Sequence, residues 1–385
     1  MFSSHLWTEQ GRRSPSHPNY SSWNKQISSP PSSFDIPPLH FCSIKEGRFI
    51  LQQSNYLSRL QWAETYLRFQ QTIHESTSRQ QLIQMKYTSS VRPWTTKQQQ
   101  CIHYYIRGLS TYLYNWGLQH LFTQRSSPLQ FILLSSGMDW NFPFTIGTST
   151  IVFTEHVLHQ MKRAVDTLDQ SSMDRWLTTL CHEWTHLLQR TPSIQPIFYR
   201  WYKQYFGLRP SSVHIPRAWY DYIITNPDTI DSYLPNQSSI GPQWVRLSNT
   251  WVFTLSKGTI GKGELTGFGG YEYYMATMFV YKGKKQTVLI CLQPYHLPSS
   301  SSISKKEQEY VMKGPILPAD MLPEYRQLFF GCTKQIDHPH EAIANLFSEY
   351  IIQGNRYLGH PTLTTISQMS GRFYQELISS LSRVM

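Results

Sequence analysis

Apolar side chains recur at helical spacing along three stretches of this chain, residues 95–122, 171–190 and 339–353. In each stretch the apolar positions gather on one face and polar positions occupy the rest, a pattern that predicts amphipathic helices. A further helical region is expected between Glu46 and Lys86. In the stretch at residues 171–190, the apolar stripe consists of Leu177, Cys181, Trp184 and Leu188.

The residues that flank these stretches are ones that begin and end helices. Thr95 or Thr96 is the expected N-cap of the first, with a glutamine three residues further on as its capping partner. Ser171 is the expected N-cap of the second helix, and Pro192 ends it. Pro339 suits the first turn of the third helix, because proline lacks the N–H that a helix start leaves unpaired.

Between the helices the pattern changes to short apolar runs that are typical of strands. Residues 131–134 and 150–154 form two such runs, separated by turn-forming glycine and proline. Residues 244–293 are rich in aromatic and β-branched side chains and are interrupted by glycines, which predicts a β-rich region. We expect an edge strand at residues 148–153, because a free strand edge can hold an extended peptide. The combined pattern predicts an α+β fold.

One of the predicted helices carries an H-E-x-x-H sequence, His182-Glu183-Trp184-Thr185-His186. Histidines four residues apart lie on the same face of a helix, so both imidazoles can bind one metal ion. The glutamate between them lies beside that metal, where it can accept a proton from a water molecule. The two histidines and the glutamate fall outside the apolar stripe, which predicts that they face a cleft.

A catalytic zinc site needs a third protein ligand in addition to two histidines. Glu341 is the first candidate, because it stands near the start of the helix at residues 339–353 and away from its apolar stripe. Glu349, His338 and His340 are the alternatives in the same segment. Each of these four residues has an oxygen or nitrogen atom that can bind Zn²⁺. The sequence therefore predicts a zinc site formed by the two histidines and one residue of this segment.

The segment at residues 180–190 resembles the active-site helix of gluzincin metallopeptidases, and residues 341–345 resemble their glutamate helix, as in the anthrax lethal factor group. The chain is more similar still to zinc metallopeptidases of nucleocytoplasmic large DNA viruses. These have an H-E-x-x-H helix ending in Gln-Arg, an Asn-Pro-Asp segment and a late His-Pro-x-Glu. The matching residues here are Gln189-Arg190, Asn226-Pro227-Asp228 and His338-Pro339-His340-Glu341. The likeness covers roughly residues 130–355 and implies a zincin-like fold.

The resemblance implies that His182, His186 and Glu341 bind Zn²⁺ and that Glu183 is the general base of a peptidase. Gluzincins often carry an acidic residue four positions after the ligand glutamate, where it hydrogen-bonds to a zinc-binding histidine. This chain has Asn345 at that position. Its amide oxygen can accept the same bond but raises the basicity of the histidine less.

A peptidase of this kind also needs a group that stabilises the oxyanion formed when the peptide carbonyl is attacked. A tyrosine or a histidine is expected in that role. The candidates are His338, His340, Tyr350 and Tyr357.

The net charge and the cysteine content indicate which partners and which cellular compartment to expect. The formal net charge is +11, and this basic balance indicates weak contact with nucleic acid or another polyanion, although the basic residues form no dense stripe. The 5 cysteines lie far apart and form no C-x-x-C pair, which argues against a disulfide scaffold or a cysteine-based zinc site. This usage predicts a reducing, intracellular compartment, which for a viral protein is the host cytoplasm or the virion. We expect neither a signal peptide nor a transmembrane segment.

These patterns divide the chain into four regions. Residues 1–40 form an arm that is flexible or docks on a partner protein. Residues 41–128 form helices that pack on a zincin-like catalytic domain at residues 129–360, which has a β-rich insertion at about 240–295, and residues 361–385 form a C-terminal helix. The expected activity is zinc-dependent hydrolysis of a protein or peptide substrate. The alternative is a virion or structural protein that retains a zinc site without peptidase activity.

Overall fold

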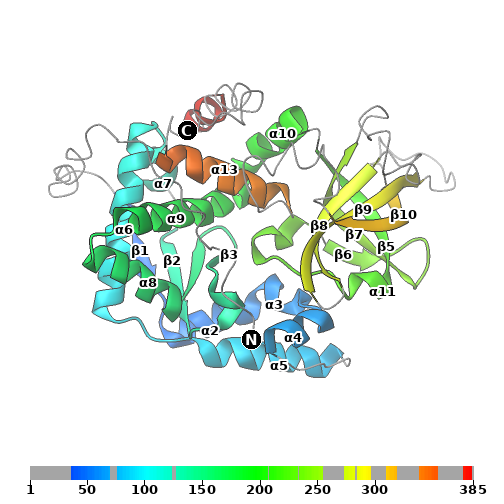
Figure 1. Cartoon of the computed structure of the whole chain (residues 1–385), viewed down its shortest axis with the longest axis horizontal. Helices are drawn as coiled ribbons and strands as arrows, with labels where there is room; N and C mark the ends of the chain where they lie inside the picture. The colour runs from blue at the N-terminus through cyan, green and yellow to red at the C-terminus, as the bar shows by residue number, and fades with distance from the viewer. Residues whose placement is uncertain are drawn as a thin grey trace, which may run out of the picture. The chain divides into compact units, whose positions relative to one another are not determined.

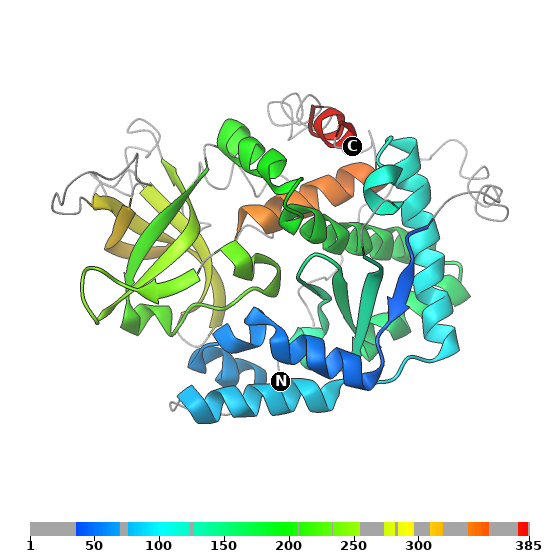
Figure 2. The same cartoon turned by 180° about the vertical axis from the view of Figure 1, so that it is seen from behind.

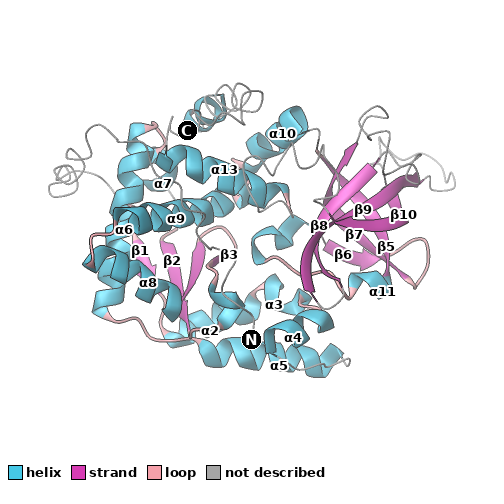
Figure 3. Cartoon of the chain, in the orientation of Figure 1, coloured by secondary structure: helices cyan, strands magenta, loops and turns pink. Residues whose placement is uncertain are grey.

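The computed structural model describes ten stretches of the chain, shown by position in Figure 1 and by element type in Figure 3. They are residues 36–69, 76–123, 127–206, 208–232, 234–254, 273–281, 284–295, 309–318, 338–353 and 376–383. Most of the predicted N-terminal arm therefore lies outside the described residues. At its end, Leu39 and His40 belong to strand β1 (Leu39–Phe41), which pairs with a strand of the core.

Helices form most of the first part of the described chain. They are α2 (Ile44–Gln53), α3 (Asn55–Arg59), α4 (Trp62–Phe69), α5 (Ser76–Ser90), α6 (Thr96–Asn115) and α7 (Gln119–Thr123). Helix α6 begins with the predicted capping box, in which the side chains of Thr95 and Gln98 each accept the other's backbone N–H. This reciprocal pair satisfies two amides that would otherwise lack partners.

A four-stranded sheet packs against α2, α3 and α5 on one face (Figure 2). Its strands are β1 (Leu39–Phe41), β2 (Leu129–Leu134), β4 (Thr150–Thr154) and β3 (Phe144–Ile146), in that spatial order. β1, β2 and β4 are parallel, and β3 is antiparallel to β4. Ile132, Leu134 and Val152 share a buried cluster with side chains of α2 and α5. On the other face, Phe131 stacks on Phe41 with ring centroids 5.4 Å apart.

The position of β4 corrects the predicted edge strand. Residues 148–153 were expected at the edge, but β4 lies between β2 and β3, and β3 is the edge strand. The reason is a hairpin: the chain passes through η3 (Met138–Asn141) and folds β3 back onto the outer side of β4. Sequence periodicity identified the strand but not which neighbour would cover it.

Two helices follow the sheet, α8 (Glu155–Asp166) and α9 (Gln170–Arg190), and α9 carries the metal motif. Asp169, and not Ser171, is the N-cap of α9, because its carboxylate accepts the backbone N–H of Ser172 at 3.2 Å. A carboxylate at a helix start also interacts favourably with the helix dipole. α9 ends at Arg190, just before Pro192, as the sequence predicts.

A second sheet follows after α10 (Gln195–Phe206). Its strands are β5 (Arg209–Pro216), β6 (Leu234–Gln237), β7 (Trp244–Thr254), β8 (Tyr273–Tyr281), β9 (Lys284–Tyr295) and β10 (Glu309–Pro318), with α11 (Arg217–Tyr220) and η4 (Pro227–Ser232) between β5 and β6. β5 pairs with both β7 and β10, which closes five strands into a small barrel. The predicted β-rich insertion at residues 240–295 falls inside this barrel, whose strands extend further in both directions.

Helix α13 (Pro339–Gln353) lies along α9, as Figures 1 and 2 both show. Trp116 at the end of α6 holds the far end of α13: its indole N–H donates to the Ile351 carbonyl at 3.0 Å, and its ring lies 4.9 Å from that of Tyr350. This packing brings the start of α13 beside the metal motif. Of the predicted C-terminal helix, residues 376–382 are helical, and residues 361–375 lie outside the described stretches.

The described cysteines are buried free thiols, namely Cys42, Cys101, Cys181 and Cys291. Cys332 lies outside the described residues. Within the ten stretches listed above, no helix has the length and apolar character needed to cross a membrane.

Candidate metal centre

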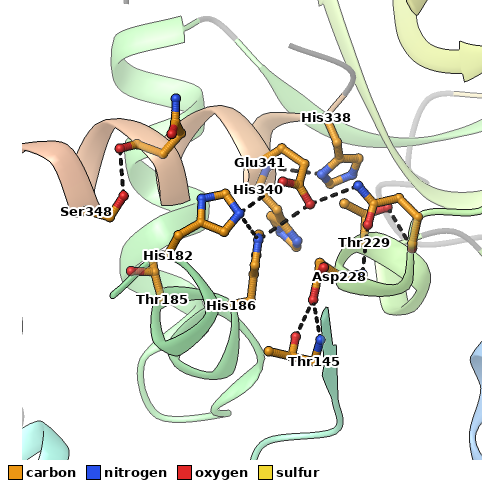
Figure 4. A network of polar contacts seen from close by, with 12 residues as sticks. Thr145, His182, Thr185, His186, Asp228, Thr229, His338, His340, Glu341 and Ser348 are labelled. Carbon is orange, nitrogen blue, oxygen red and sulfur yellow. Dashed lines mark hydrogen bonds and ion pairs between the residues drawn. The ribbon is translucent and has the colours of Figure 1, made fainter. Parts of the chain in front are cut away.

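Helices α9 and α13 bring three side chains with metal-binding atoms together in the interior (Figure 4). His182 and His186 lie one turn apart on α9, and their Nε2 atoms are 2.9 Å apart. Glu341, in the first turn of α13, places Oε2 3.2 Å from His182 Nε2 and Oε1 3.4 Å from His186 Nε2. We call these three residues the triad.

The spacing within the triad fits a metal ion. Ligand atoms at about 2.0–2.1 Å from a tetrahedral centre are about 3.4 Å from one another, close to the distances between the triad atoms. Among the described residues, the triad is the group of His, Cys, Asp and Glu side chains whose ligand atoms converge within 4.8 Å. The triad therefore could hold a metal ion, and Glu341 rather than Glu349, His338 or His340 completes the group.

Gln189 orients the ring of His186. The Nδ1–H of His186 donates to Gln189 Oε1 at 2.8 Å, while Gln189 Nε2 donates to the backbone carbonyl of His340 at 3.0 Å. With the proton on Nδ1, the Nε2 lone pair of neutral His186 points at the other triad atoms, as metal binding requires. The sequence predicts this type of contact for Asn345. In the structure, Gln189 makes it to His186, and Asn345 accepts a bond from Ser348 through its backbone carbonyl.

Asn226 contacts the third triad residue. Its Nδ2 donates to Glu341 Oε1 at 2.8 Å, and its Oδ1 accepts the backbone N–H of Asp228 at 2.9 Å. The second bond identifies which side of the amide is the oxygen, so the donor must face Glu341. An amide donor on one carboxylate oxygen restricts rotation of the glutamate side chain.

Arg190 and Asp228 hold the Asn226 loop against the first sheet. Asp228 Oδ1 accepts the backbone N–H of Thr145 in β3 at 2.8 Å and also the Thr145 hydroxyl. Arg190 donates to Thr145 Oγ1 at 2.7 Å and to the Gly147 carbonyl at 3.1 Å, and its other terminal nitrogen lies 3.5 Å from Asp228. The Gln-Arg and Asn-Pro-Asp segments carried only a resemblance in the sequence. In the structure they form one hydrogen-bonded network around the triad.

Glu183 lies next to the triad and has the properties of a base. It is 4 % exposed, and in the described part of the chain its Oε2 has no hydrogen-bond partner. Burial raises the pKa of Glu183 well above its usual value, and the negative charges of Asp228 and Glu341 raise it further, against the opposing effect of Arg190. A buried carboxylate with a raised pKa and an oxygen without a partner in the described chain accepts a proton more readily than an ordinary glutamate does.

Glu341 and His186 favour each other's charged forms. Burial disfavours the charged form of Glu341, but His186 and His182 outweigh this effect and hold the pKa of Glu341 well below its usual value. Burial likewise disfavours charged His186, yet Glu341 and Asp228 raise the pKa of His186. An ionised carboxylate ready at this position is the form that a metal ion needs.

The four candidates for stabilising an oxyanion fall into three groups. His338 and His340 adjoin the triad: His338 Nδ1 accepts the backbone N–H of His340 at 3.0 Å, and burial lowers the pKa of His338 to about 3. Both imidazoles are therefore neutral and can donate only one hydrogen bond each. Tyr350 faces α6, where it contacts Trp116. Tyr357 lies outside the described residues.

In the part of the chain that the structure describes, the triad is buried, whereas the apolar stripe predicted that it faces a cleft. His182 is 8 % exposed, His186 0 % and Glu341 4 %, because α13 lies over the polar face of α9. The edge of β3 is also occupied, since its Thr145 N–H and the nearby Gly147 carbonyl are engaged by Asp228 and Arg190. A strand-shaped substrate could not pair at these two positions without displacing the chain's own side chains.

A cavity of about 480 Å³ lies elsewhere, between α10 and residues 376–383. Arg200, Trp201 and Arg383 are among its lining residues, and none of the triad residues is. The cavity therefore does not provide access to the triad.

Comparison with known proteins adds no relative: no family model, no curated protein and no solved structure matches this chain. The described residues form a mixed α+β structure with two sheets and a buried His-His-Glu group that could hold a metal ion.

Proposed function

We propose that this protein is a zinc-dependent peptidase in which His182, His186 and Glu341 hold the metal ion. The observation that carries the proposal is the convergence of two imidazole Nε2 atoms and one carboxylate within 3.4 Å of one another. Two histidines and a glutamate are the ligands of a well-known class of catalytic zinc sites, which keep a fourth position open. When bound, zinc would polarise a carbonyl oxygen and lower the pKa of a water molecule toward about 7.

Glu183 is the general base in this proposal. Its free Oε2 takes the proton of the attacking water and then passes that proton to the leaving amine nitrogen. Its raised pKa makes Glu183 a stronger base than an ordinary glutamate, which favours acceptance of the proton. Gln189 keeps His186 in the tautomer that presents its Nε2 lone pair, and neutral His338 or His340 supplies a hydrogen-bond donor near the reacting carbonyl.

The test is Glu183→Gln in protein purified without chelator. We expect about one zinc per chain in both proteins, measured by elemental analysis, because Glu183 is not a ligand. Hydrolysis of an unfolded protein substrate such as casein should fall by about 10²- to 10⁴-fold, the usual contribution of a general base. Equal activity of the variant would refute the assignment of Glu183, and a chain free of zinc would refute the metal site.

A second candidate function is a structural metal site in a protein that binds partners without hydrolysing them. Two observations favour it: the triad residues are 0–8 % exposed, and the edge of β3 is occupied by Arg190 and Asp228. In that case zinc would act as a cross-link between α9 and α13. Wild-type protein would then contain zinc, show no casein hydrolysis above that of Glu183→Gln, and unfold when the metal is removed.

The net charge of +11 adds a proposal about partners. A basic protein of this kind binds polyanions through counterion release, so any affinity for DNA should fall steeply with salt. Measurement of DNA binding at two salt concentrations tests this proposal independently of the metal site.

A further inference from the structure

Asn226 lies in a loop that is fixed at both ends. On its C-terminal side, Asp228 is held by Thr145 and Arg190, as described above. On its N-terminal side, the backbone N–H of Thr225 donates to Glu64 Oε1 at 2.9 Å, and the Thr225 hydroxyl donates to the Arg59 carbonyl at 3.1 Å. Glu64 belongs to α4, so a helix far away in the sequence holds the residue next to Asn226.

Glu64 is itself held in place. It is 0 % exposed, its Oε2 accepts the backbone N–H of Gln61 at 2.9 Å, and Arg68 Nη2 lies 3.3 Å from its Oε1. Arg68 in turn contacts Asp139 in η3. A carboxylate with this many partners has little freedom to move. The N–H of Thr225 therefore has a fixed acceptor, and the backbone that carries Asn226 has a fixed starting point.

The Glu341 side chain depends on this loop for its orientation. A glutamate in the first turn of a helix has three rotatable side-chain bonds, and the triad needs its two oxygens turned toward His182 and His186. The Asn226 amide, 2.8 Å from Oε1, approaches from a different element than either histidine. Groups that hydrogen-bond to a metal ligand typically change metal affinity by about 10- to 100-fold when they are removed.

We propose that Asn226 is the positioning residue for the Glu341 carboxylate, and that Glu64 of α4 acts on the metal centre through Thr225 and Asn226. This inference rests on the metal-binding part of the proposed function and not on peptidase activity. It assigns the N-terminal helices a role in shaping the metal centre, which their sequence does not reveal.

The experiment measures zinc affinity by competition with a chromophoric chelator, in the full chain. Asn226→Ala should weaken zinc binding by about 10- to 100-fold. Glu64→Ala should weaken it by about 2- to 30-fold, the range for residues that act through others. Glu64→Gln keeps an oxygen for the Thr225 N–H but loses the acceptor for the Gln61 N–H, so it should weaken zinc binding less than Glu64→Ala does. Asn115→Ala, at the exposed end of α6, is the matched control and should leave zinc affinity unchanged.

The double variant tests whether Glu64 acts on the metal centre through Asn226. If Glu64 acts through Asn226, then Asn226→Ala combined with Glu64→Ala should bind zinc no more weakly than Asn226→Ala alone. If Glu64→Ala does not fold, Glu64→Asp replaces it, because the shorter side chain withdraws its oxygen from Thr225. If the losses of zinc affinity add up in the double variant, Glu64 does not act through Asn226, and the proposal is overturned.

Thermal unfolding of the metal-free proteins separates positioning from simple stability. A purely structural role would lower the Tm of Asn226→Ala without lowering its zinc affinity, and that result would overturn the proposal. Wild-type protein that binds zinc while Asn226→Ala binds it equally well would overturn this inference and leave the proposed function standing. Wild-type protein that binds no zinc would overturn both.

Discussion

Histidine and glutamate side chains contact one another in both of the sheet-containing regions that the structure describes. Between α9 and α13, His182 Nε2 lies 3.2 Å from Glu341. Inside the barrel, His214 Nε2 lies 3.0 Å from Glu309 Oε2. By distance alone the two contacts are equivalent. The surroundings of the two contacts differ, and this difference indicates which contact belongs to a candidate metal centre.

In the barrel, the histidine and glutamate use their atoms on one another and on fixed neighbours. His214 Nδ1 lies 2.8 Å from Ser238 Oγ, and Arg246 Nε donates to Glu309 Oε1 at 2.9 Å. Every ring nitrogen and carboxylate oxygen of the pair therefore has its own partner. Such a network stabilises a structure and leaves nothing for a ligand.

Between α9 and α13 the atoms converge instead. Two imidazole Nε2 atoms and both oxygens of Glu341 point at one place, and Glu183 beside them has a buried oxygen without a partner in the described chain. Three groups whose ligand atoms point at one position are an arrangement that could hold a metal ion. The comparison teaches that convergence, and not proximity, distinguishes a binding centre from a structural ion pair.

The largest expected difference between the two regions is in metal binding. His186→Ala should lower zinc affinity by more than about 100-fold, because it removes a ligand and so exceeds the effect of removing a supporting group. His214→Ala should leave zinc affinity unchanged but lower the free energy of unfolding by about 1.5–3 kcal/mol, since it breaks a hydrogen bond to a charged group. Competition titration and denaturant unfolding measure the two quantities. If His186→Ala binds zinc with the affinity of the wild type, the triad is no more a metal site than the His214–Glu309 pair.

A smaller difference is expected for the two glutamates. Glu341→Gln should weaken zinc binding by about 10- to 100-fold, because a neutral amide replaces the carboxylate, while Glu349→Gln on the same helix should not. Glu309→Gln keeps an oxygen for Arg246, so it should cost roughly 1 kcal/mol of stability and leave zinc binding unchanged. Equal zinc affinity of Glu341→Gln and Glu349→Gln would contradict the assignment of the third ligand.

The smallest effect is a dependence on pH that belongs to the barrel. Burial would raise the pKa of Glu309, but hydrogen bonds from His214 and Arg246 outweigh it, so its pKa in the folded protein lies below the usual 4.5. A lowered folded pKa stabilises the fold above about pH 4.5, and this contribution is lost as pH falls through the folded value. Thermal unfolding of the metal-free protein at pH 6 and pH 3.5 should show a gap between wild type and Glu309→Gln that narrows at the lower pH. A constant gap would show that Glu309 contributes no such dependence.

Much of the local structure could be predicted because it depends on neighbours in the sequence. The capping box of Thr95 and Gln98, the end of α9 before Pro192 and the start of α13 at Pro339 all follow from contacts within about one helical turn. The predicted N-cap of α9 was wrong, because Asp169 and not Ser171 caps the helix. Several polar residues near a helix start can serve, and the backbone geometry selects one.

The arrangement of the strands and the covering of the metal motif could not be predicted in the same way. An apolar run at residues 150–154 predicts a buried strand whether it is internal or at an edge, and only the hairpin of β3 makes it internal. Likewise, the polar face of α9 predicts either a cleft or a covered site. The packing of α13, anchored by Trp116, decides for the covered site.

The sequence by itself determined that His182 and His186 share one face of α9 with Glu183 beside them, because residues four apart on a helix lie one turn above each other. Only the tertiary structure chose Glu341 over its rivals, assigned Gln189 to His186 and brought Asn226 to Glu341. The physical reason is the separation along the sequence of the residues that interact. Helical periodicity acts over a few residues, whereas the metal centre is assembled from α9, α13 and the Asn226 loop, whose contacts exist only once the chain has folded.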